Sequence, residues 1–175
     1  MRNRLHEFLR SKRATAAIEF AIIAPVMVIM AAGTSEVGRY FVVYDAVNRL
    51  ATQYASAWAD CSDVPTGTCA TELSTFASAQ AIANIAPRLT PSKTTLSMFQ
   101  VAMSGSTPTI VSSYPSGASL SSTQIAAATS TFTSGQSGVV VTVSYNHTLD
   151  YFPSVMTPSL GSILSFSFTI AQLKS

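Results

Sequence analysis

The sequence predicts an α+β protein in which a long N-terminal helix, first transmembrane and then amphipathic, precedes a small domain with an antiparallel sheet. Two patterns lead to this prediction. An apolar run follows a basic N-terminus and passes without interruption into apolar residues spaced three and four apart, which is the period of a helix. In the C-terminal half, apolar and polar residues alternate instead, which is typical of half-buried strands.

The basic residues are concentrated at the N-terminus. The formal net charge is +2, but five basic side chains against one acidic side chain give residues 1–13 a charge of +4, so the remaining residues total −2. A basic segment before an apolar run indicates that residues 1–14 stay in the cytoplasm while the following chain crosses the membrane. A nucleic-acid-binding arm is the competing interpretation. No basic patch follows to contact phosphates, so no nucleic-acid partner is expected.

Residues 15–33 form the predicted transmembrane helix. Between Ala14 and Gly33 the only ionisable side chain is Glu19, and about 20 residues rising 1.5 Å each span the roughly 30 Å hydrocarbon core. A cleaved signal peptide is the alternative, with the small residues 31–33 as its cleavage site. Signal peptides have shorter apolar runs of about 7 to 15 residues, and this run contains a carboxylate and continues as a helix. We therefore expect the helix to be retained as an anchor.

Glu19 requires an explanation, because a carboxylate at the centre of a bilayer costs about 2.5 to 3.5 kcal/mol on insertion scales. One interpretation places it near the cytoplasmic headgroups, shortly after Arg13, where the cost is small. The other pairs it with a neighbouring chain. Small residues in the same segment offer a surface for close packing against another helix: Ala16, Ala17, Ala21 and Ala24.

Residues 34–60 extend the helix beyond the membrane with an apolar stripe. We expect the stripe to pack against the protein's own sheet, although an intermolecular coiled-coil seam is an alternative that three heptads do not decide. The stripe consists of Val37, Tyr40, Tyr44, Val47, Ala51, Tyr54 and Trp58.

Residues 61–175 form the predicted exported α+β domain. Cys61 and Cys69 are the only cysteines, and in an oxidising compartment their spacing predicts a structural disulfide. A second helix is expected from about Glu72 to Ile85, ending before Pro87. Alternation predicts strands at 139–147 and 164–170, with a less regular pair at about 95–103 and 109–113. The Ser- and Thr-rich stretch 116–137 is expected to be a long loop, or a weak helix near 124–128.

No catalytic motif is present. His147 and Asp150 are three residues apart among many serines, but the sequence contains no G-x-S-x-G elbow, no phosphate-binding loop and no H-E-x-x-H helix. His147 is interpreted as an ordinary surface or turn residue at a strand end. We therefore expect no enzymatic activity, no cofactor, no metal site and no small-molecule substrate.

The first 40 residues carry a resemblance to a known family. The run TAAIEF, Thr15 to Phe20, preceded by basic residues and continued by AIIAP, resembles the TadE-like minor pseudopilins of the bacterial Tad (Flp) type IVc pilus system. The run EVGR at 36–39, the long helix and the strand-rich C-terminal half are similar to that family in layout. The resemblance implies a pilin-like fold and a part in assembling or priming a pilus that supports surface attachment.

The resemblance also implies a processing site. A prepilin peptidase would cut after Ala14, four residues before the pair Glu19 and Phe20. This cut would leave Thr15 as the new N-terminus and residues 1–14 as a basic cytoplasmic leader. Ala14 stands where the family commonly has glycine. Glu19 would then meet the amino terminus of a neighbouring subunit, and a paired charge costs far less than an isolated one.

The implied partners are the inner membrane, other pilus subunits or pseudopilins, and the prepilin peptidase. The implied location is single-pass in the inner membrane, with a cytoplasmic N-terminus and a periplasmic C-terminal domain, and incorporation into a surface pilus. The alternative is an unprocessed static protein of the inner membrane or an exported binding protein, similar to a TadG-like anchor or an adhesin.

Overall fold

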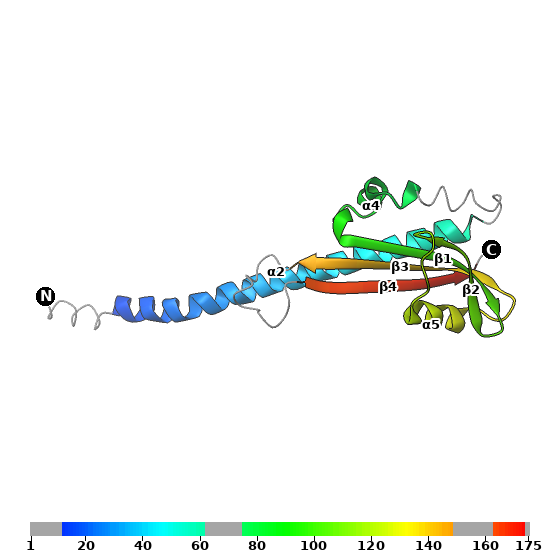
Figure 1. The fold of residues 1–175 in the computed structure, drawn as a ribbon. Helices are drawn as coiled ribbons and strands as arrows, with labels where there is room; N and C mark the ends of the chain where they lie inside the picture. The colour runs from blue at the N-terminus through cyan, green and yellow to red at the C-terminus, as the bar shows by residue number, and fades with distance from the viewer. Residues whose placement is uncertain (1–11, 62–74, 149–162, 174–175) are drawn as a thin grey trace. The chain divides into compact units, whose positions relative to one another are not determined.

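The computed structural model describes residues 12–61, 75–148 and 163–173, and it divides the chain into two compact units. The described part of the N-terminal unit is residues 12–39. The described part of the second, which we call the sheet unit, is residues 40–61, 75–148 and 163–173. The order of elements is α2, α4, η1, β1, β2, α5, β3 and β4 (Figure 1).

The long helix α2 (Lys12–Ala59) includes Pro25 and continues past it. Proline lacks the N–H for one helical hydrogen bond, but bilayer helices tolerate this loss where neighbouring groups satisfy the freed carbonyl. Thr34 Oγ1 donates to Met30 O at 2.9 Å further along the helix. The span of α2 confirms that the predicted helix continues past the apolar run, and the helix ends at Ala59.

Four antiparallel strands form one sheet in the order β2-β1-β3-β4. They are β1 (Thr94–Ser104), β2 (Thr107–Tyr114), β3 (Ser137–Thr148) and β4 (Ile163–Leu173). In the registers of β3, Val141 is opposite both Met98 of β1 and Ile170 of β4. The α+β class with a long apolar helix and an antiparallel sheet is confirmed, and all four predicted strands are present.

The larger core lies between α2 and one face of the sheet (Figure 1). Val47, Ala51, Tyr54 and Trp58 of the predicted stripe are each at most 2% exposed, and they share this core with Val139, Val141 and Val143 of β3. Packing against the protein's own sheet is thus confirmed for the second half of the stripe. Its first half is more open, because Val37 is 55% and Tyr44 42% exposed.

The short helix α5 (Ser122–Thr131) covers part of the opposite sheet face. Ala128 and Phe132 pack there against Phe99, Val101 and Val140. The stretch expected to be a long loop or a weak helix therefore contains a helix with a second small core. As a result, β3 is buried on both faces around Val139–Val141, whereas its alternation predicted one exposed face.

The predicted helix from Glu72 to Ile85 is confirmed at its end, Ile85, but it is not continuous within its described part. Residues 75 and 76 are helical, but Ala77 is a turn, and α4 (Ala79–Ile85) begins anew after Ser78. The Ser78 side chain accepts a hydrogen bond from Ala81 N at 3.3 Å, so it caps a new helix. After α4, the single-turn helix η1 (Pro91–Lys93) leads into β1. Residues 62–74 lie outside the described part.

Candidate functional site

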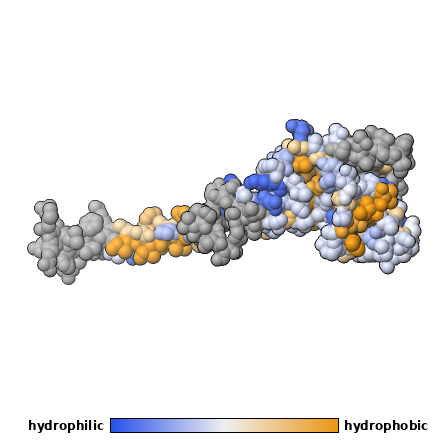
Figure 2. Space-filling model, in the orientation of Figure 1, coloured by the Kyte–Doolittle hydropathy of each residue, from blue (hydrophilic) through white to orange (hydrophobic). Residues whose placement is uncertain are grey.

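The first half of α2 is an apolar surface. It contains an 18-residue window with a mean hydropathy of 2.1, no residue of which is buried. Fully burying a large apolar side chain is worth about 1.5 to 3 kcal/mol, so such a surface strongly favours lipid or other helices over water. Length and composition suit a single membrane-crossing helix, and Figure 2 shows the apolar side chains together. Those more than 50% exposed are Ile18, Phe20, Ile22, Ile23, Val26, Met27, Val28 and Met30.

The residues predicted for processing and assembly lie at the start of this surface. Ala14 is within α2, and Thr15, Glu19 and Phe20 are all exposed, Phe20 by 72%. Thr15 and Glu19 are four residues apart, so they lie on the same face of the helix, one turn from each other. A carboxylate among exposed apolar side chains is thus available to a neighbouring chain.

A second carboxylate of α2, Glu36 of the EVGR run, was given no functional role from the sequence. Glu36 is 5% exposed and is the only buried residue among the described side chains of the N-terminal unit. Its neighbours Ser35, Val37 and Arg39 are exposed. Local spacing gave no signal for this burial, because Glu36 stands in a polar stretch where helix periodicity predicts a solvent-facing side chain.

An aromatic cluster joins α2 to the C-terminal strand within the sheet unit. The ring of Tyr40 contacts Phe166 edge-on with centroids 5.1 Å apart, and Tyr44 contacts Phe168 in the same way at 6.4 Å. Edge-to-face pairs add about 0.5 to 1.5 kcal/mol beyond the area that they bury. Phe166 and Phe168, two residues apart on β4, therefore face α2, and their contacts fasten the strand to the helix.

His147 does not occupy the surface position that the sequence predicted. It is 7% exposed, and its ring stacks on Phe166 with centroids 6.2 Å apart. The interpretation was wrong because β4 brings an aromatic ring over this end of β3. Asp150, the other residue considered for a catalytic pair, lies outside the described residues.

Tyr54 is a buried polar residue with a partner. Its hydroxyl donates a hydrogen bond to the carbonyl of Phe76. Burial, together with the nearby Tyr114, raises the pKa of Tyr54 to about 12, so the hydroxyl keeps its proton, and can donate this bond, well into the alkaline range. This bond holds residue 76 against α2. The sequence between these two residues contains Cys69.

The predicted disulfide remains a prediction. Cys61 follows the end of α2 and packs, partly buried, against the larger core. Cys69 lies outside the described residues.

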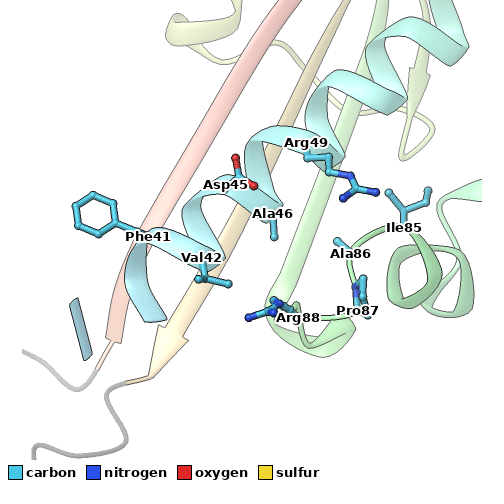
Figure 3. A pocket seen from close by; sticks show the side chains of 9 residues that line it. All are labelled: Phe41, Val42, Asp45, Ala46, Arg49, Ile85, Ala86, Pro87 and Arg88. Atoms are coloured by element: carbon cyan, nitrogen blue, oxygen red, sulfur yellow. The ribbon is translucent and has the colours of Figure 1, made fainter. Parts of the chain in front are cut away.

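A groove of about 470 Å³ opens between α2 and the chain that follows α4 in the sheet unit. We call it the arginine groove, because Arg49 and Arg88 lie on two sides of it (Figure 3). It was not predicted, since its walls are about 40 positions apart in the sequence and only the tertiary fold brings them together. Its lining comprises Phe41, Val42, Asp45, Ala46, Arg49, Ile85, Ala86, Pro87 and Arg88.

Comparison with known proteins addresses the N-terminal part of the chain. Residues 14–55 match a family model described as TadE-like protein. Neither the curated proteins nor the solved structures yield a match. The matched range contains the residues predicted for processing and assembly, the whole apolar surface and most of the helix that enters the sheet unit. The chain therefore carries a TadE-like domain over residues 14–55, consistent with a TadE-like protein of Tad pilus systems.

Proposed function

We propose that this protein is a membrane-anchored pseudopilin-like subunit that takes part in assembling or priming a Tad (Flp) pilus and so supports surface attachment. The observation that supports it best is the coincidence of the TadE-like match with the exposed apolar half of α2. One apolar helix near the N-terminus suggests single-pass anchoring. The proposal adds that the N-terminus is cytoplasmic and the sheet unit periplasmic.

Glu19 is the proposed assembly residue. It is an exposed carboxylate amid apolar side chains that suit a membrane, where an unpaired charge is costly. Pairing with a positive group of a neighbouring subunit would offset that cost. Cleavage between Ala14 and Thr15 by a prepilin peptidase would create such a group, the new α-amino terminus. Phe20, exposed by 72%, would pack beside this pair.

The proposed role is structural rather than enzymatic. The proposed partners are other pilus subunits, the prepilin peptidase and the inner membrane. The alternative is a static TadG-like anchor or an adhesin that keeps residues 1–14. The two roles differ in what they require of Glu19, because a static anchor needs only an apolar helix, whereas an assembling subunit needs the charge.

Complementation of a deletion strain tests the proposal. Glu19→Gln keeps the size of the side chain and removes its charge, so we expect normal protein levels in the membrane but a loss of pili and of surface attachment. Asp60→Asn is the matched control, because Asp60 is exposed at the other end of α2. Wild-type piliation in the Glu19→Gln strain, or in the deletion strain itself, would refute the assembly role.

A further inference from the structure

The arginine groove is lined by apolar side chains and by two arginines, Arg49 and Arg88. Phe41 and Val42 are 63% and 38% exposed, and Ile85, Ala86 and Pro87 complete the apolar lining. Side chains of this kind favour an apolar occupant, since each that is covered gains the free energy of leaving water. The occupant is therefore expected to present at least one apolar side chain.

The charges of the groove select the occupant further. The chain has only three basic residues between positions 40 and 173, and two of them, Arg49 and Arg88, line this one groove. In the part of the chain that the structure describes, neither makes an ion pair. Asp45 also belongs to the lining, so the groove carries two positive charges and one negative charge. A planar guanidinium matches a carboxylate by forming two parallel hydrogen bonds, so two of them favour an acidic occupant.

We infer that the arginine groove binds a segment of another protein in which an apolar side chain stands beside an aspartate or glutamate. A second copy of this chain fits less well. Of its described acidic residues outside the groove, Glu19 lies in the apolar part of α2 that suits a membrane, and Glu36 is buried. Asp60 of the sheet unit is left, and its neighbour Ala59 is buried. Asp60 therefore has no exposed apolar neighbour on that side to enter the groove with it. This inference goes beyond the proposed function, because it does not require that the protein enter a filament.

Site-specific photo-crosslinking in native cells tests the inference on the full-length protein. The crosslinking amino acid p-benzoylphenylalanine replaces Phe41, which lines the groove. In a control strain it replaces Phe76, a phenylalanine that is also exposed, by 58%, but lies outside the groove. We expect irradiation to join position 41, and not position 76, to a different protein. Mass spectrometry should place the adduct within about one helical turn of an aspartate or glutamate.

Charge removal provides the decisive comparison. In the Phe41 crosslinking strain, the double change Arg49→Gln and Arg88→Gln is expected to abolish the adduct, and either change alone to weaken it. Lys93→Gln, which removes a basic charge outside the groove, should leave the adduct intact. Fluorescence of Trp58, buried in the core, verifies that each variant is folded.

Four results would overturn the inference. They are an adduct that persists in the folded double variant, an adduct to lipid or to a second copy of this chain, an adduct that maps far from any acidic residue, and the absence of any adduct at position 41. Unchanged piliation in the double variant would leave the inference intact, because filament assembly is a separate property.

Discussion

Gln124 Nε2 donates a hydrogen bond to Thr142 Oγ1 at 3.0 Å and thereby ties α5 to the central strand β3. The same nitrogen donates to Ser97 Oγ at 3.0 Å, and Gln124 Oε1 accepts from Ser121 N at 2.8 Å. Thr142 Oγ1 in turn lies at hydrogen-bond distance, 2.9 Å, from Thr169 Oγ1 of β4. One buried glutamine thus caps its own helix and anchors a row of hydroxyl groups across β1, β3 and β4.

Replacing this glutamine should destabilise the sheet unit. Gln124→Leu removes three hydrogen bonds, one of which is half of the capping box, and we expect a loss of about 2 kcal/mol in the free energy of unfolding. Gln53→Leu, at an exposed position of α2, is the control and should change stability little. Urea unfolding followed by Trp58 fluorescence measures both. Equal stability of the two variants would contradict the role given to Gln124.

Gly138 is required because the ring of Phe132 lies directly over it. A Cβ at position 138 would overlap the ring of Phe132 at Cζ, so Gly138→Ala should destabilise by about 1 to 3 kcal/mol through overpacking. Adding Phe132→Leu should recover part of this loss, since the two changes affect one contact. Gly38→Ala, where nothing lies within 4 Å of the added carbon, should not destabilise. Additive losses in the double variant would argue against the steric explanation.

Tyr54 should make stability fall at high pH. Its pKa is raised to about 12 in the folded protein from about 10 in an unfolded chain. The folded state therefore holds its proton where the unfolded state has lost it, and this contribution is complete below pH 10 and declines as pH rises toward 12. Tyr54→Phe should be less stable at pH 7, by about 1 kcal/mol for the lost hydrogen bond, and should lose less stability between pH 9 and about 11. Parallel pH profiles for the two proteins would refute this account.

Ala14 should limit processing if a prepilin peptidase acts on this chain. The TadE-like resemblance places glycine at this position, so Ala14→Gly is expected to raise the processed fraction in a pulse-labelling experiment. Ala16→Gly, a control with the same change two residues later, should not. A lower processed fraction for Ala14→Gly would show that the cut lies elsewhere.

Much of the fold was predictable because its signals are local. The period of two in β3 and β4 and the apolar helix of α2 follow from residues close together in the sequence. The capping box of α5 was also present as Ser121 and Gln124 with two residues between them, but the surrounding serines and threonines concealed it. Ser78 likewise is a residue type that caps helices, but it lies within the stretch 72–85, which was predicted to be one continuous helix.

The features that escaped prediction depend on contacts between distant segments. Burial of Val140 requires α5 to return over the sheet, and burial of His147 requires Phe166 of β4 to stack on it. The arginine groove requires the chain after α4 to return to α2. Glu19 was the opposite case: its position in an apolar run marked it from the sequence alone.

The central claim, that this is a processed pilin-type subunit, is tested most directly by the intact mass and N-terminal sequence of the protein purified from its own membranes. The measurement is made in cells with and without the prepilin peptidase. The account predicts a chain that starts at Thr15 when the peptidase is present and at Met1 when it is absent. A start at Met1 in both strains, or one near Thr34, would contradict it.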